Sequence, residues 1–136
     1  MSTDEASAPV VRHARPDGRP CCEYTMVAGK KHGPGRMFYP SGKVYAEETW
    51  ANDELNGPTV TYDENGGKQS ELNYQDGQLH GLTREFFPSG AVETETHYAF
   101  GLKDGREVVY TEAGTLEREA HYKAGRPVSA PAQSAG

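Results

Sequence analysis

Apolar residues, cysteines and long hydrophobic runs are all scarce in this sequence of 136 residues. Hydrophobic residues make up 35% of the chain, against roughly 45–50% in typical globular domains when glycine is counted. This shortage argues against a single deep core. The two cysteines, Cys21 and Cys22, are adjacent, so they provide neither a disulfide framework nor the ligand set of a structural zinc site. No segment approaches the ~20 apolar residues of a membrane-spanning helix.

Positive charge is also in short supply. The net charge is −6, and residues 33–126 carry nine basic against sixteen acidic side chains. A surface of this sign repels phosphate groups, so nucleic acid and an anionic membrane are disfavoured as partners and a protein with a basic surface is favoured. The first residues, MSTDEASAPVV, are acidic and lack the apolar stretch of a secretory signal, so we expect a cytoplasmic protein.

What the sequence does contain is a repeat of 24 residues. Counted from the first glycine of each unit, the same residue types return at fixed offsets. The unit glycines are Gly33, Gly57, Gly81 and Gly105. One aromatic column follows at offset five (Phe38, Tyr62, Phe86, Tyr110) and a second at offset seventeen (Trp50, Tyr74, Tyr98, Tyr122). Glutamates recur at offset fourteen, as Glu47, Glu71, Glu95 and Glu119. A fixed period of this length is the signature of a repeat architecture.

Within each unit, apolar and polar residues alternate with a period of two, which is typical of half-buried strands rather than helices. Short segments such as PSG, ENG and EAG supply a turn between two such stretches. Each unit therefore predicts a β-hairpin. The whole chain predicts an all-β fold, an elongated antiparallel meander of stacked β-hairpins with about nine or ten strands. Simple alternation places both aromatic columns on one face and the glutamates on the other, among Thr, Asn and His.

The repeats define one domain over residues 9–126. Residues 9–32 place Gly18, Glu23 and Gly29 at the expected offsets, which predicts a degenerate capping repeat. Regular repeats follow at residues 33–56, 57–80, 81–104 and 105–126. The flanking segments 1–8 and 127–136 are rich in Ala, Ser and Pro, so we expect disordered tails there.

These residues resemble a known family. The spacing of glycines, glutamates and aromatics over residues 18–126 is similar to the MORN repeat, in the variant seen in YwqK-like bacterial proteins described as antitoxins. The resemblance implies stacked β-hairpins that serve as a scaffold, sometimes with lipid association. For small stand-alone versions it implies an antitoxin or immunity role. Asp53, where other units have glycine, and Lys68, where other units have Val or Leu, depart from the pattern.

The glutamate column is the first candidate for chemistry. Equivalent strands of neighbouring repeats lie ~9.6 Å apart, which is too far for adjacent carboxylates to share a metal ion or a proton. His97 and His121 share an offset and are separated in the same way. We therefore expect no catalytic residue, no metal and no cofactor. Two interpretations of the glutamates stay open: a solvated structural ladder, or an acidic stripe that receives a basic partner.

Apolar side chains on the predicted polar face form the second candidate. Met37, Tyr39, Tyr45 and Phe87 fall there, and clustered exposed aromatics mark interaction sites. If the N-terminal repeat folds over the cluster of the first unit, these side chains are structural instead. Both interpretations stay open.

The favoured function is a non-enzymatic protein-binding module, an antitoxin or immunity protein that blocks a toxin by direct contact. The alternative is a self-assembling or membrane-associated scaffold, because an open terminal strand permits end-to-end association into a weak homo-oligomer. The candidate partner-binding residues are Tyr39, Tyr45, Glu47, Glu71, Phe87, Glu93, Glu95, His97 and Glu119.

Overall fold

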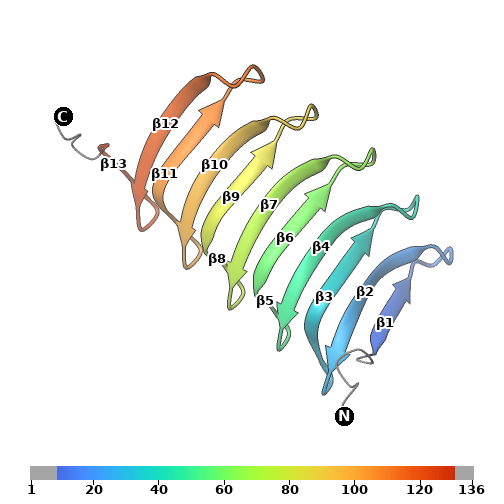
Figure 1. Cartoon of the computed structure of the whole chain (residues 1–136). Helices are drawn as coiled ribbons and strands as arrows, with labels where there is room; N and C mark the ends of the chain where they lie inside the picture. The colour runs from blue at the N-terminus through green and yellow to red at the C-terminus, as the bar shows by residue number, and fades with distance from the viewer. Residues whose placement is uncertain (1–8, 131–136) are drawn as a thin grey trace, which may run out of the picture.

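The computed structural model describes residues 9–130 as one open antiparallel β-sheet (Figure 1). All regular secondary structure in this part of the chain is strand. The predicted all-β meander of stacked hairpins is therefore confirmed. Residues 1–8 and 131–136, which make up most of the two predicted tails, lie outside the described residues. The last strand reaches Val128, inside the segment that the sequence assigned to the C-terminal tail.

The sheet contains thirteen strands rather than the expected nine or ten. They are β1 (Val10–Ala14), β2 (Pro20–Val27), β3 (Lys30–Phe38), β4 (Val44–Ala51), β5 (Glu54–Leu55), β6 (Gly57–Tyr62), β7 (Lys68–Gln75), β8 (Gln78–Leu79), β9 (Gly81–Phe86), β10 (Val92–Ala99), β11 (Leu102–Tyr110), β12 (Leu116–Lys123) and β13 (Arg126–Val128). The count rises because segments assigned to linkers are themselves paired. Strand β5 pairs with β4 and β8 pairs with β7, each just before the next long strand begins.

Tight turns with positive φ close the linker side of every hairpin. Residues at offsets nineteen and twenty both have φ between 49° and 85°, as a type I′ turn requires. The pairs are Ala28 with Gly29, Asn52 with Asp53, Asp76 with Gly77, Phe100 with Gly101 and Ala124 with Gly125. Asp53 adopts a φ of 71° without being glycine, and its carboxylate accepts the N–H of Lys31 at 2.8 Å. The first linker is therefore as regular as the others.

Each hairpin also contains a β-bulge shortly after its other turn. The strand register shifts at the same place in all five hairpins. The unpaired residues are Cys21, Tyr45, Gln69, Glu93 and Glu117. Since side chains alternate with a period of two, one extra residue reverses the face that every later side chain occupies.

The bulge makes the predicted assignment of the faces wrong. Glu47 lies directly opposite Arg36 and accepts a hydrogen bond from the hydroxyl of Tyr62 at 2.7 Å. The glutamates therefore share a face with the first aromatic column. The second aromatic column lies on the other side of the sheet, where Trp50 faces Gly33. We call these surfaces the glutamate face and the Trp50 face.

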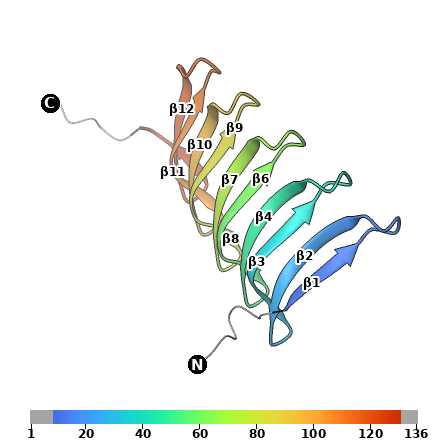
Figure 2. The same cartoon turned by 45° about the vertical axis from the view of Figure 1, so that its right-hand side comes forward.

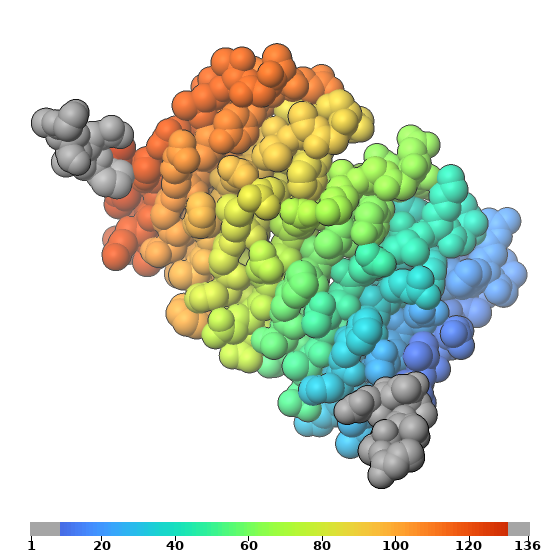
Figure 3. Space-filling view, viewed as in Figure 1, coloured from blue at the N-terminus to red at the C-terminus, as the bar shows by residue number. Residues whose placement is uncertain are grey.

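The sheet is a single layer, and its burial comes from side chains packed along each face (Figures 2 and 3). In residues 9–130, only Ala46 and Val108 are buried apolar side chains. On the Trp50 face, the rings of Tyr24 and Trp50 meet edge to face with centroids 5.7 Å apart. Both rings press on Gly35, where a Cβ atom would lie 2.8 Å from Tyr24 and 3.2 Å from Trp50. Packing between neighbouring hairpins thus replaces a globular core.

Two columns of side-chain hydrogen bonds add to the backbone pairing between hairpins. The residue before each unit glycine accepts a backbone N–H from the type I′ turn of the next hairpin. These acceptors are His32, Asn56, His80 and Asp104, and their donors are Asn52, Asp76, Phe100 and Ala124. Two residues after the glutamate, Thr25, Thr49, Asn73 and His97 contact the backbone carbonyls of Pro34, Pro58, Leu82 and Arg106. These polar side chains therefore form hydrogen bonds that join one repeat to the next.

Candidate protein-binding surface

One row of side chains crosses the glutamate face from β1 to β12. Each member lies directly opposite the next in the sheet register. In order, the row is Arg12, Glu23, Arg36, Glu47, Val60, Glu71, Arg84, Glu95, Val108 and Glu119. An arginine or a valine therefore separates the glutamates of neighbouring repeats.

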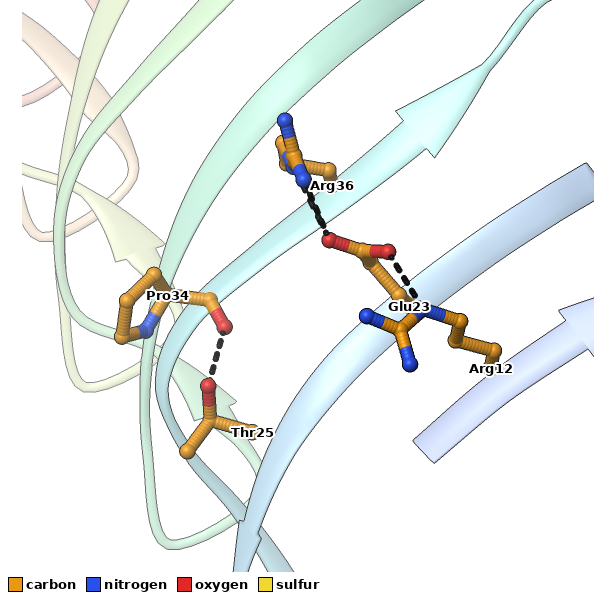
Figure 4. A network of polar contacts seen from close by, with 5 residues as sticks. All are labelled: Arg12, Glu23, Thr25, Pro34 and Arg36. Carbon is orange, nitrogen blue, oxygen red and sulfur yellow. Dashed lines mark hydrogen bonds and ion pairs between the residues drawn. The ribbon is translucent and has the colours of Figure 1, made fainter. Parts of the chain in front are cut away.

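The arginines of this row bind the glutamates beside them. Glu23 accepts hydrogen bonds from Arg12 at 3.3 Å and from Arg36 at 2.7 Å (Figure 4). Arg84 lies between Glu71 and Glu95, with N–O distances of 3.6 Å and 2.7 Å. Exposed ion pairs of this kind contribute about 0–1 kcal/mol each. Much of the acidic column is thus neutralised within the molecule.

Basic neighbours also lower the pKa values of Glu71 and Glu119 in this row. The ammonium group of Lys68 hydrogen-bonds Glu71 at 2.7 Å and lowers the pKa of this carboxyl below its usual range. Hydrogen bonds from Arg106 and His121, at 3.0 Å and 2.8 Å, lower the pKa of Glu119. Both carboxylates are therefore charged and already paired at neutral pH.

Glu47 is the exception in this row. Among residues 9–130 no basic side chain forms an ion pair with it, and its Oε1 accepts only the Tyr62 hydroxyl. That hydrogen bond raises the pKa of Tyr62. The carboxylate borders an open recess of about 550 Å³, which we call the Glu47 recess. It is lined by Gly42, Lys43, Val44, Glu47, Tyr62, Asn65 and Gly66. An exposed carboxylate here lies beside an apolar side chain and a phenol ring.

Tyr39 and Tyr45 lie at the turn between β3 and β4 and line a different hollow from the Glu47 recess. Their rings meet edge to face at 5.2 Å, and the Tyr39 hydroxyl donates to the carbonyl of Tyr62 at 2.7 Å. The N-terminal hairpin contributes Arg15 and Cys21 to the hollow of about 290 Å³ that both tyrosines line. Tyr45 nevertheless stays 39% exposed. The N-terminal hairpin thus borders this aromatic cluster and leaves part of it open.

The other predicted residues lie further along the sheet. Phe87 is half-buried at the equivalent of Tyr39, two repeats or about 19 Å away. Glu93 is the half-buried bulge residue of β10. His97 is exposed, and its Nδ1 lies 3.1 Å from the carbonyl of Arg106. The structure therefore brings Tyr39 and Tyr45 together and places Glu47 in a separate recess, because no residue lines both hollows. The binding role of each predicted residue stays a prediction.

Four segments of the chain match one family of repeats. The model of the MORN repeat variant matches residues 31–52, 55–76, 79–99 and 103–124. The chain belongs to the MORN repeat variant family. Proteins built from MORN repeats are in general binding or scaffold modules rather than catalysts. The narrower resemblance to YwqK-like antitoxins stays a prediction.

Solved structures with weak similarity to this MORN repeat chain also exist. The present chain matches a chain of "Crystal structure of GtfA/B complex bound to UDP and GlcNAc" with 14% identity and a TM-score of 0.40. The match covers 70% of the present chain and 23% of the other, so the MORN repeats span about a quarter of that chain's length. No curated protein matches the sequence.

Sequence reasoning missed the arginines that bind the glutamate column of this MORN repeat protein. Arg36 and Arg84 occupy the same offset in alternate repeats, but simple alternation placed them on the opposite face. The signal that was available is the constant position of the turn glycine, which fixes where a bulge follows. Correct placement of the bulge puts Arg36 opposite both Glu23 and Glu47.

Two kinds of feature are absent from the part of the chain that the structure describes. Within residues 9–130, no three side chains of His, Cys, Asp or Glu are close enough to hold a metal ion together. The same part of the chain contains no helix with the length and apolar character needed to span a membrane.

Proposed function

We propose that this MORN repeat protein is an antitoxin or immunity protein that neutralises a partner protein by direct contact at the Glu47 recess. The observation that carries the proposal is the unpaired state of Glu47 in a row where the other glutamates of residues 9–130 have basic partners. A carboxylate without an internal partner is available to a partner's cation. The net charge of −6 supports a partner of basic surface and fast association with it.

A lysine or arginine side chain fits the chemistry of this recess. Its aliphatic stem would lie on Val44 and the ring of Tyr62, and its cationic end would reach Glu47. Binding of a toxin across this face would neutralise it by covering its active site.

The test is affinity capture from the native cell extract, followed by a binding measurement on the purified partner. We expect wild type to capture a basic protein in stoichiometric amount and Glu47→Lys to lose it. Glu112→Lys is the matched control, because Glu112 makes the same charge change on an exposed turn outside the recess. Co-expression with the captured partner should restore cell growth for wild type and not for Glu47→Lys. Substitution of Glu71, Glu95 or Glu119 is less informative, since it also breaks internal ion pairs.

Equal capture by wild type and Glu47→Lys would move the interface away from this recess. A captured partner that has no effect on growth would contradict the antitoxin role while leaving protein binding intact.

A further inference from the structure

We propose that the two ends of the sheet bind each other between copies of this chain, so that strand β12 of one molecule pairs with β1 of the next in head-to-tail order. This inference uses strand edges outside the Glu47 recess and does not depend on the toxin-binding proposal. It rests on the register, charge and hydrogen-bonding pattern of the terminal hairpins. The second copy of the chain is called the neighbour below.

Both ends of the described sheet present backbone edges. Within residues 9–130, β1 pairs only with β2. At the other end, β13 pairs only with His121, Tyr122 and Lys123 of β12. Residues 116–120 of β12 therefore have no strand on their outer side in the described part of the chain. An exposed strand edge is a template for pairing with another chain.

The position of a strand that would pair with residues 116–120 of β12 can be read from the other repeats. Strand β13 occupies the same offset as β5 and β8, which are followed by β6 and β9. Strand β6 pairs with Glu47 of β4, and β9 pairs with Glu71 of β7. The corresponding residue of β12 is Glu119. Strand β1 has the offsets of β6 and β9, because it lies 24 residues before the equivalent part of β3. The β1 strand of a neighbour thus matches, in register, the position beside residues 116–120 of β12 where the described residues place no strand.

Charges at the two ends are complementary at this register. The row of the glutamate face begins with Arg12 on β1 and ends with Glu119 on β12. Inside the sheet, Arg84 bridges a glutamate on each side. Arg12 has the same position in its hairpin but binds only Glu23, and its side chain is 73% exposed. In the head-to-tail joint, Arg12 bridges Glu23 and the neighbour's Glu119, as Arg84 bridges its two glutamates.

A second contact of the internal joints is also available at the end. Side chains two residues after each glutamate contact the carbonyl that follows the next unit glycine, as Thr49 contacts Pro58 at 2.8 Å. His121 has this position in the last hairpin, and its Nε2 lies 2.8 Å from Glu119. In the joint, the backbone carbonyl of the neighbour's Val10 lies where the Pro58 carbonyl lies inside the sheet. His121 contacts it as Thr49 contacts the Pro58 carbonyl. Because the two edges differ, the joint is heterologous and propagates an open-ended array.

The test measures the weight-average mass of the full chain by light scattering from micromolar to millimolar concentration. We expect the wild-type mass to rise above the 14.8 kDa of one chain as concentration increases. Glu119→Lys and Arg12→Glu each place like charges in the joint and should weaken association by about tenfold or more. Glu64→Lys is the control, since it makes the same charge change on the exposed turn between β6 and β7, away from both end strands, and should associate as wild type.

An equimolar mixture of Glu119→Lys and Arg12→Glu provides the decisive comparison. Every joint between unlike molecules then contains opposite charges, so association should return to the wild-type level. This recovery also shows that both variants are folded. A wild-type mass of 14.8 kDa at every concentration would overturn the proposal, as would a mixture that stays monomeric. If Glu119→Lys or Arg12→Glu alone associated as strongly as wild type, the joint would not pair β12 with β1. That result would also overturn the proposal. Glu47→Lys should associate as wild type, which separates this result from the toxin-binding test.

Discussion

At the scale of residues, the position two places after each unit glycine lies buried on the Trp50 face in all four family repeats. It is occupied by Gly35, Thr59, Thr83 and Glu107. The first three are small, as expected for a site beneath large rings. Glu107 is only 9% exposed, and it is satisfied by hydrogen bonds from Thr96 at 3.0 Å and Lys103 at 2.9 Å. This position is therefore occupied by glycine in the first repeat, by threonine in the next two and by a charged, hydrogen-bonded glutamate in the last.

Gly35→Ala tests this close packing. A Cβ atom at this position would lie 2.8 Å from Tyr24 Cδ1, so one ring must move and the free energy of unfolding should fall by about 1–3 kcal/mol. Urea denaturation followed by Trp50 fluorescence measures the change. Gly67→Ala is the matched control, because Gly67 also lacks positive φ and its nearest neighbour is the flexible carboxylate of Asp63. Equal stability of Gly35→Ala and wild type would show that the rings are not fixed by this contact.

Glu107 should make the stability of the protein sensitive to acid. Burial by itself would raise the pKa of Glu107, but hydrogen bonds from Lys103 and Thr96 outweigh it and the pKa is lowered. A carboxyl whose folded pKa is below its unfolded value of about 4.3 stabilises the fold above that pH. The contribution is lost as pH falls through the folded pKa. Glu107→Gln should lower the free energy of unfolding by about 1–3 kcal/mol at neutral pH.

The measurement is urea denaturation of wild type and Glu107→Gln between about pH 7 and about pH 3. The difference between the two proteins should shrink as the pH falls. A difference that stays constant across this range would assign the effect to packing rather than to the charge of Glu107.

At the scale of elements, each hairpin depends on its neighbours for the hydrogen bonds of its own turn. Phe100 has positive φ in a type I′ turn. Its backbone N–H donates a hydrogen bond to Nδ1 of His80 from the preceding hairpin, at 3.1 Å. Asn56 fills the same role through its amide oxygen, at 2.9 Å from the N–H of Asp76. Different side chains are interchangeable here as long as they present an acceptor at this distance from the backbone.

His80→Ala should therefore destabilise the protein, while His80→Asn should be tolerated. The alanine variant leaves the Phe100 N–H without its acceptor and removes the ring contact at 4.5 Å, which should lower the free energy of unfolding by about 1–2 kcal/mol. The asparagine variant keeps an acceptor, as Asn56 does. Amide hydrogen exchange at Phe100 provides the local measurement. Equal protection in both variants would show that this side chain does not hold the turn.

At the scale of the whole molecule, every hairpin contacts only the hairpins beside it, as Figure 1 shows. Stability in such an array is close to a sum of the repeats and their nearest-neighbour contacts. The sheet has no central core that a missing repeat would open. Its properties therefore depend on which side chains each joint brings together.

Deletion of residues 57–80 should leave a folded protein with one hairpin fewer. The m-value for urea unfolding should fall by roughly one fifth, since it follows the surface exposed on unfolding. The deletion also places Glu47 opposite the equivalent of Val60 in the third repeat, which is Arg84. Glu47 then gains an internal basic partner, and capture through the Glu47 recess should be lost. Circular dichroism checks the strand content, and an unfolded variant would contradict the additive description.

Much of the architecture was readable from the sequence, because a local pattern repeated at fixed spacing dictates local structure. The glycines at fixed offsets predicted the turns, and the period of two predicted the strands. The regular turn at Asp53 was less evident, because its positive φ of 71° is supported by a hydrogen bond to Lys31, which is distant in sequence. The two-residue strands β5 and β8 were missed, since pairing of so short a segment depends on the strand beside it.

The candidate site was predicted less completely for the same physical reason. The glutamate column and the pair Tyr39 and Tyr45 were recognised from their positions, but the face that the glutamates share with Arg36 and Arg84 was not. A side chain's face depends on the number of residues between it and the turn, and one bulge residue per hairpin reverses it. The special status of Glu47 depends on Arg36, which lies opposite it but hydrogen-bonds Glu23 on the preceding hairpin instead. Val60, on the other side of Glu47, supplies no charge.

The amino-acid sequence by itself determined a repeated hairpin, its period, its turns and the acidic balance of the array, because each of these follows from residues close together in the chain. The tertiary structure decided which columns share a face, which carboxylates are neutralised and which one has no basic partner among residues 9–130. Those properties arise only when strands from different repeats are set side by side in one register.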